Sequence, residues 1–432
     1  MIKFAAELFH RFKKNEFYRN VFTLFSGSVI AQGIAFLITP LLTRLYPDFQ
    51  FGIFFLFTSM SLTIAGSACL QYETAIVIPK DDRDALNLTV LCFIIAFIFS
   101  ILTAMALFFF SDGICRILKN DNIRHYFFIV PVSVFALGVN QAVSAWNNRK
   151  KQYRFISVIN VTKSVSSGTV QSLAGISGFL NSGLIVGNLF GQIISLMLQI
   201  RKWFMEARDS LKAISFKRMF YLAKVYKNMP IFNTFSNIMN NLSNQLPVFL
   251  LTRFFGVSSA SYYGISNRII ATPMGLIGQS VSLVFIQNAA EASYNKQNLF
   301  KLLKGMYWRL FKIAFIPFTL LFFASPFLFK LILGNSWDCH LASNIARILI
   351  PWLLVGFLNS SLGLIINILK KQSAYTIYNF LLLVFRFLSI WLGYLFSKNL
   401  LFALFLFSIT GLIFNLFLVF YLLKVSKNDS ET

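Results

Sequence analysis

Four cationic residues stand inside long apolar stretches of the chain, where a positive charge is costly. They are Lys163, Arg268, Arg347 and Arg386. An ionisable group at bilayer depth costs roughly 2.5–3.5 kcal/mol on insertion scales, so it faces a protein interior or a water-filled cavity. Arginine presents a planar fork of N–H donors, whereas lysine presents a point charge. These residues therefore predict a cationic cavity within a membrane protein.

Each of these cations also has a simpler explanation. Arg268 and Arg386 could form internal ion pairs, although the apolar stretches contain almost no carboxylate to pair with them. Lys163 and Arg347 lie nearer the ends of their stretches, and their side chains could extend to the bilayer surface. Periodicity favours a cavity for Arg268, because it shares one helical face with three further residues. These are Thr272, Gly275 and Gln279.

Two other stretches place polar groups at helical spacing. In NTFSNIMNNLSNQLP, four amides lie within roughly 60° at 100° per residue. They are Asn233, Asn237, Asn240 and Asn244. Amides offer both donors and an acceptor, which suits sugar hydroxyls, but they also join helices to one another in membranes. Tyr375 and Asn379 accompany Arg386 in the same way, less completely.

Three more charged residues lie near the ends of apolar runs. Arg44 and Arg253 each close the phrase LLTR, at residues 41–44 and 250–253. Anchoring at the bilayer surface is the default for such arginines, and substrate contact is the alternative. Glu73 is the clearest carboxylate in these runs, which makes it a candidate for ion coupling.

The elements that must position these residues are transmembrane helices. The chain has 432 residues, of which 57% are hydrophobic and 12% charged. A helix needs about 20 apolar residues to cross a bilayer, and apolar runs of that length exclude the short alternating strands of a barrel. We predict an all-α integral membrane protein of about twelve spans. The spans are 21–43, 51–73, 85–110, 123–145, 155–175, 180–200, 230–252, 261–286, 310–333, 342–368, 374–395 and 400–423.

Lys and Arg gather in alternate connecting segments, which predicts that both termini are cytoplasmic. The basic segments are 1–20, 74–84, 146–154, 201–229, 287–313, 369–373 and the tail. This distribution explains the net charge of +24 without nucleic acid, which is not an expected partner.

The two LLTR phrases end the first and seventh spans, so they lie at equivalent positions of two halves that run the same way through the membrane. Such a parallel repeat is typical of two-lobed transporters. The expected domains are an amphipathic cytoplasmic segment (1–20), an N-lobe (21–200), a basic linker (201–229), a C-lobe (230–423) and a cytoplasmic tail (424–432).

No pattern of enzyme chemistry stands out. Cys69, Cys92, Cys115 and Cys339 are far apart, without the spacing of a metal site or a disulfide framework, so no metal and no cofactor is expected. The acidic cluster at 81–84 is the only local candidate for an enzymatic site, and a solvated loop explains it better.

Several stretches resemble bacterial O-antigen and capsule flippases. SGSVIAQGIAFLITPLLTRLYPDFQFGIFFLF (26–57) resembles their first hairpin, QYETAIVIPKDDRDALNL (71–88) their second-to-third span segment, and YYGISNRIIATPMGLIGQSVSLVF (262–285) their eighth span. These flippases form the polysaccharide transporter family of the multidrug/oligosaccharidyl-lipid/polysaccharide (MOP) exporter superfamily. The family's motifs fall on Gln32, Arg44, Gly52, Tyr72, Glu73, Pro79 and Arg268.

The resemblance implies that the chain flips an undecaprenyl-pyrophosphate-linked oligosaccharide across the bacterial inner membrane by alternating access. It also implies a cationic lumen and ion coupling. The implied partners are the lipid-linked glycan, membrane lipids, a polysaccharide polymerase and a chain-length regulator. Two alternatives stay open at this point: a multidrug cation exporter, which would want acidic groups in its cavity, and a membrane polysaccharide polymerase, which usually has a long periplasmic loop.

Overall fold

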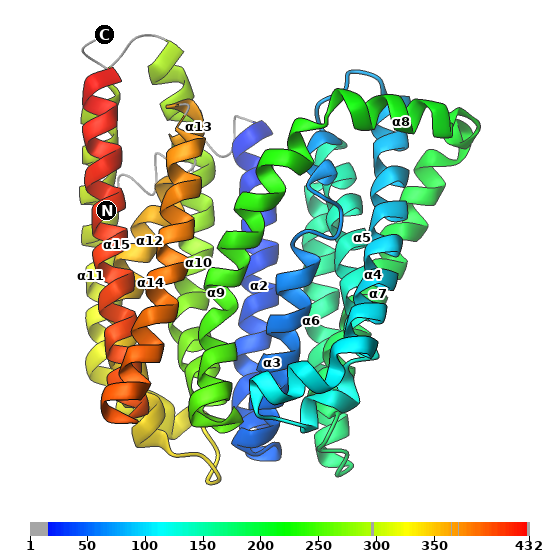
Figure 1. Ribbon diagram of the computed structural model, residues 1–432. Helices are drawn as coiled ribbons and strands as arrows, with labels where there is room; N and C mark the ends of the chain where they lie inside the picture. Colours follow the sequence, from blue (N-terminus) through cyan, green and yellow to red (C-terminus); the bar gives the residue numbers. More distant parts are fainter. Residues whose placement is uncertain (1–15, 295–297, 364, 370, 430–432) are drawn as a thin grey trace. The chain divides into compact units, whose positions relative to one another are not determined.

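The computed structural model describes residues 16–294, 298–363, 365–369 and 371–429 (Figure 1). Every regular element among these residues is a helix. The predicted cytoplasmic segment 1–20 lies largely outside the described residues, as do the last residues of the predicted tail.

Each predicted span overlaps one long helix, although the predicted tenth span, 342–368, runs beyond the end of its long helix at Leu362. These helices are α2 (Glu16–Leu45), α3 (Asp48–Ala65), α4 (Asp82–Leu118), α5 (Ile129–Arg149), α6 (Tyr153–Ile176), α7 (Gly183–Ala207), α9 (Thr234–Phe255), α10 (Val257–Tyr294), α11 (Leu299–Ile332), α12 (Cys339–Leu362), α14 (Gln372–Ser397) and α15 (Leu400–Asp429). Within the described ranges, nine of them are long and apolar enough to cross a membrane. Of the other three, α6 and α9 are long enough but more polar, and many side chains of α10 lie outside the described residues. These three helices carry many of the predicted site residues.

Shorter elements connect the long helices. They are η1 (Tyr72–Ala75), η2 (Asn122–Tyr126), η3 (Arg208–Ala213), α8 (Phe216–Val225), the π-helical turn η4 (Met229–Asn233) and α13 (Ile365–Ile368). The predicted second span, 51–73, is too long, because α3 ends at Ala65. The carbonyl of Gly66 accepts hydrogen bonds from Asn237 Nδ2 at 2.8 Å and Gln71 Nε2 at 3.1 Å. These side chains replace the helical donor, and the chain leaves the helix.

The helices form two compact units, and the division falls within α9. Unit 1 comprises Met1–Tyr46 and Ile53–Gln245, and unit 2 comprises Pro47–Gly52 and Leu246–Thr432. In unit 1, α6 packs closely against both α2 and α7, and α4 packs against α5. Two glycines of α7 permit this approach: a Cβ on Gly187 would lie 2.8 Å from the Gln171 nitrogen, and one on Gly191 would lie 2.7 Å from the Lys163 carbonyl oxygen.

Within unit 1, charged contacts join the loop before α4 to the end of α5, and α8 to the start of α4. Arg149 Nε donates to Asp82 Oδ1 at 3.0 Å, and its Nη1 donates to the carbonyls of Ile76 and Pro79. Arg218 of α8 donates through Nε and Nη2 to both carboxylate oxygens of Asp84 at 2.7 Å. Asp82 and Asp84 of the acidic cluster therefore pair with arginines, and these pairs connect elements of unit 1.

In unit 2, α12 packs against α10, α11 and α15, and α14 packs against α15. The start of α3 belongs to this unit and touches the start of α10. A Cβ on Gly52 would lie 2.2 Å from the carbonyl oxygen of Val257. Phe51 stacks edge-on against Trp337, with ring centroids 5.2 Å apart.

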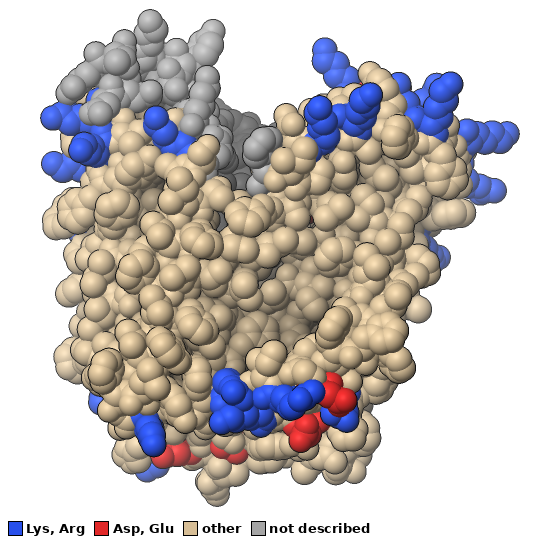
Figure 2. All heavy atoms as spheres, viewed as in Figure 1, with Lys and Arg blue, Asp and Glu red and all other residues tan. Residues whose placement is uncertain are grey.

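Surface chemistry fits a membrane environment. On the face shown in Figure 2, most Lys and Arg side chains gather at the ends of the helices, and the stretch between them is largely uncharged. On α4, Phe108, Phe109 and Phe110 are 78%, 72% and 67% exposed. Rings exposed to this extent on consecutive residues indicate a surface in contact with lipid rather than water.

Candidate functional site

Helix α10 has one buried apolar face and one partly exposed polar face. Ile265, Ile269, Ile270 and Met274 are buried. Arg268 and Thr272 are partly exposed, and Gly275 is exposed. A Cβ on Gly275 would meet no heavy atom within 4 Å. The polar residues that the sequence assigns to one face thus lie on the accessible side of the helix.

This polar face is suited to water rather than lipid. Where α4 is exposed it presents phenylalanines, whereas α10 presents a guanidinium, a hydroxyl and a bare backbone at Gly275. Asn267, which periodicity did not single out, is also partly exposed beside Arg268. The side chain of Gln279 lies outside the described residues. An accessible guanidinium and an accessible amide on consecutive residues of one helix can bind an anionic group attached to a hydroxyl-rich molecule.

The surroundings of Arg386 are different. This residue is 3% exposed, and its guanidinium carbon lies 5.0 Å from the Trp352 ring centroid and 5.4 Å from that of Phe407. Arginine stacks favourably on aromatic faces, more strongly when water is excluded. The contacts place Arg386 within unit 2, where it joins α14 to α12 and α15. Asn379, on the same helix, is also buried.

Arg347 and Lys163 lie on different units. Arg347 Nε donates to the Phe322 carbonyl at 3.1 Å, and its guanidinium stands 5.7 Å from the Phe322 ring centroid. This contact joins α12 to α11. Lys163 on α6 and Gln32 on α2 are both partly exposed within unit 1.

The four amides of the predicted stripe have different environments: Asn233 lies in η4, and the other three lie on α9. Asn237 donates to Gly66 and accepts from Asn241 Nδ2 at 3.3 Å, which is the packing role that polar side chains play between membrane helices. Asn244 Nδ2 donates to Asn240 Oδ1 at 3.3 Å, and Asn233 contacts the Met229 sulfur. Asn233 and Asn244 are exposed. The stripe therefore combines one structural amide with others whose side chains are accessible.

Glu73 lies in η1, beyond the end of α3. Burial raises the pKa of its carboxyl above the ordinary value of 4.5. Its Oε2 atom is buried and has no hydrogen-bond partner among the described residues. Such a carboxyl favours its protonated form, because a buried charge without a partner is costly. Proton exchange is the chemistry that this environment permits.

The two LLTR arginines lie in the last turns of α2 and α9. Arg44 is exposed, and its Nη1 donates to the Pro40 carbonyl at 3.2 Å. Arg253 is partly exposed. Their positions at helix ends match the expectation from the sequence.

Solved structures of transporters share this fold. The chain is similar to "Lipid II flippase MurJ, inward closed conformation", with a TM-score of 0.73, 15% identity and coverage of 94% of this chain and 90% of that one. It is similar to an inward-facing multidrug resistance MATE family transporter of the MOP superfamily, with a TM-score of 0.70, 13% identity and coverage of 94% and 99%. It is also similar to a MOP superfamily transporter from Pyrococcus furiosus, with a TM-score of 0.66, 14% identity and coverage of 96% of each chain.

Comparison of the sequence with known proteins identifies a family. A Shigella flexneri protein described as "Putative O-antigen transporter" is 24% identical over 282 residues, which cover 62% of this chain and 63% of that protein. The match thus spans less than two thirds of the relative's length. The family model described as "Polysaccharide biosynthesis protein" matches residues 73–342, more than half of the chain. The chain therefore belongs to the polysaccharide biosynthesis protein family, and it has the fold of MOP superfamily transporters.

Proposed function

We propose that the protein flips undecaprenyl-pyrophosphate-linked oligosaccharides from the cytoplasmic to the periplasmic leaflet of the bacterial inner membrane, for O-antigen or a related surface polysaccharide. The observation that carries this proposal is the accessible polar face of α10, with Arg268 at its centre. A diphosphate needs charge-assisted donors in a place that water can reach, and this face offers them within a helix of membrane length.

The sign of the charge favours a lipid-linked anion over a multidrug cation. An exporter of organic cations would use carboxylates in its cavity, whereas the ionisable side chains within the long helices are mainly cationic. The solved MOP transporter from Pyrococcus furiosus is described by the words "Reverse polarity of binding pocket suggests different function", so charge is a meaningful criterion in this fold. The Shigella flexneri relative supports an O-antigen substrate.

In this proposal the candidate headgroup contacts on unit 2 are Arg268 and Asn267, with Arg253 at a helix end. The candidate contacts on unit 1 are Lys163, Gln32, Arg44 and the accessible amides of Asn233 and Asn244. Arg386 and Arg347 support the site by joining helices of unit 2, since their side chains already contact aromatic rings and backbone. Both termini are cytoplasmic, twelve helices cross the membrane, and two lobes alternate access to the site.

Deletion of the gene tests the proposal directly. The expected result is loss of the surface polysaccharide, together with lipid-linked repeat units that accumulate on the cytoplasmic side of the inner membrane. Their sidedness is measured by labelling the glycan in inverted and in right-side-out vesicles. Complementation with the wild-type gene is the control and should restore the polymer.

Three outcomes would contradict the proposal. Normal polymer in the deletion strain would exclude an essential flippase role, and increased sensitivity to cationic drugs with unchanged polymer would support the multidrug exporter instead. Repeat units that reach the periplasmic leaflet but remain unpolymerised would indicate a polymerase.

Glu73 leads to a prediction about pH. Its folded-state pKa is raised, so the stabilising contribution of the protonated carboxyl is full below the ordinary value of 4.5 and is lost as pH rises through the raised value. We expect Glu73→Gln to remove this loss, so that its melting temperature increasingly exceeds that of the wild type as pH rises from 4.5. Thermal unfolding of purified protein across that range measures the difference.

The control for this prediction is Asp121→Asn, which changes an exposed acid. If the Glu73→Gln and wild-type curves stay parallel across the whole range, the carboxyl does not titrate as described. Glu73 is also the candidate for ion coupling in our proposal, and flipping in vesicles that ignores both proton and sodium gradients would exclude coupling.

A further inference from the structure

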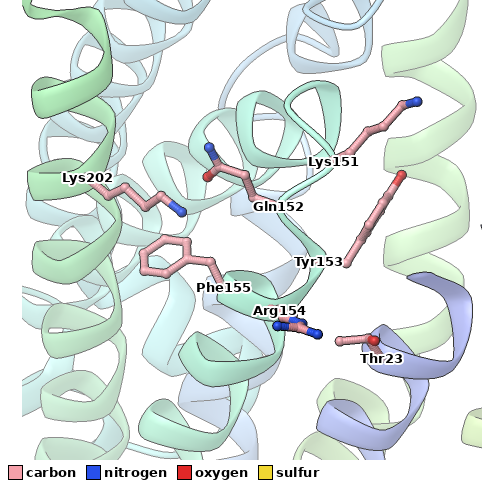
Figure 3. A pocket seen from close by; sticks show the side chains of 7 residues that line it. All are labelled: Thr23, Lys151, Gln152, Tyr153, Arg154, Phe155 and Lys202. Atoms are coloured by element: carbon pink, nitrogen blue, oxygen red, sulfur yellow. The ribbon is translucent and has the colours of Figure 1, made fainter. Parts of the chain in front are cut away.

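Unit 1 contains a basic cavity that the candidate site above does not use. Its volume is about 430 Å³. Its lining comes from the start of α2, from the turn between α5 and α6 with the first residues of α6, and from α7 (Figure 3). The residues are Thr23, Lys151, Gln152, Tyr153, Arg154, Phe155 and Lys202.

The turn between α5 and α6 exposes the positive end of a long helix to this cavity. Lys151 has a φ of 54°, which reverses the chain, and the Gln152 nitrogen donates to the Asn147 carbonyl at 2.9 Å. Helix α6 then begins at Tyr153, and Gln152 provides no side-chain cap. The first N–H groups of a helix have no partner within it and carry partial positive charge.

Two side chains add full positive charges beside this helix end. Arg154 is exposed, and among the described residues it makes no ion pair or hydrogen bond. The Lys202 ammonium stands 4.1 Å from the Phe155 ring centroid (Figure 3). Lys151 extends away from Lys202 and Phe155, so the cavity depends mainly on Arg154 and Lys202.

The carboxylate near the cavity is already occupied. Glu206 accepts hydrogen bonds from Trp146 Nε1 at 3.1 Å and from Gln152 Nε2, and it lies 3.9 Å from Lys202 Nζ. One carboxylate shared among these donors does not balance two cations and a helix N-terminus. The cavity therefore has positive charge available for an anion, beside the apolar rings of Tyr153 and Phe155.

We propose that this cavity binds the phosphate of an amphiphilic lipid headgroup, with Arg154, Lys202 and the first-turn amides of α6 as donors. The phosphate has two possible sources: the diphosphate of the lipid-linked glycan, or the phosphodiester of an anionic phospholipid. The first source rests on the proposed function; the second does not. A diphosphate held here would be captured by unit 1 before transport.

Binding to the purified full-length chain in detergent tests the proposal, with three probes: inorganic pyrophosphate, a polyprenyl diphosphate and phosphatidylglycerol. We expect the double variant Arg154→Gln/Lys202→Gln to bind at least one probe roughly 10- to 100-fold more weakly than wild type, because charge-assisted hydrogen bonds are lost. The matched control is Lys217→Gln/Lys224→Gln, which removes two exposed lysines of α8 and should change affinity less than about twofold.

The arms of the experiment separate the sources and the hypotheses. Weaker binding of both diphosphate probes identifies a diphosphate site, and weaker binding of phosphatidylglycerol alone identifies a phospholipid site. Equal affinity of the double variant and the control for all three probes would overturn the cavity proposal, even if deletion of the gene traps lipid-linked glycans. Conversely, if the double variant lost binding while the deletion strain made normal polymer, the cavity proposal would stand and the proposed function would fail.

Discussion

Arg268→Glu is expected to abolish surface polysaccharide while the protein still inserts in the membrane. Among the described side chains on its face of α10, the guanidinium is the only full charge, and the variant places a carboxylate where the diphosphate would bind. Loss of two charge-assisted hydrogen bonds, at about 1.5–3 kcal/mol each, already lowers the affinity for the diphosphate by roughly 100-fold or more. Gel analysis of the surface polymer, with the membrane level of the variant measured in parallel, tests this result.

Two further substitutions show whether the guanidinium itself matters. Arg268→Lys keeps the charge but loses the planar fork, so partial export is expected. Lys330→Glu reverses an exposed charge in the last turn of α11 and should leave export unchanged. Arg386→Glu should also stop export, with less folded protein because its side chain is enclosed by aromatic rings. Normal polymer with Arg268→Glu would overturn the cationic site.

Gly52→Ala is expected to destabilise the protein although the change adds a single methyl group. The new Cβ would lie 2.2 Å from the carbonyl oxygen of Val257, a backbone atom that cannot move aside as a flexible side chain could. Overpacking of this kind costs about 1–3 kcal/mol, more than the helical propensity that alanine gains. The melting temperature of the purified protein should therefore fall.

Gly113→Ala provides the matched control, because it makes the same substitution within α4. A Cβ at Gly113 would meet no heavy atom within 4 Å. Alanine is a better helix former than glycine by about 0.5–1 kcal/mol, so this variant should be equally or slightly more stable. Opposite signs for the two variants would support the close contact of α3 and α10, and equal effects would contradict it.

Hydropathy and periodicity predicted most of the fold, because both properties are local. A run of apolar residues long enough to cross a bilayer must form a helix, whatever surrounds it. The same local geometry placed Arg268, Thr272 and Gly275 on one face of α10, and the structure confirms that all three are accessible. The family was also recognisable from short stretches of sequence, and the family comparison confirms it.

Long-range contacts could not be predicted in this way. The second span stops early because Asn237 caps the carbonyl of Gly66, 171 residues away in sequence. Periodicity likewise treats Arg386 and Arg268 as similar cations within spans, yet aromatic rings from two other helices enclose Arg386. A helical pattern determines which residues share a face, but it contains no information about what that face meets.

The sequence by itself therefore determined the membrane class, the helices, the predominance of positive charge within them and the polar face of α10. Only the tertiary structure decided which cations remain accessible, where α3 ends, and that Arg154 and Lys202 line one cavity. The physical reason is that the bilayer acts on each helix separately through its composition, whereas enclosure and cavity formation depend on which helices pack together.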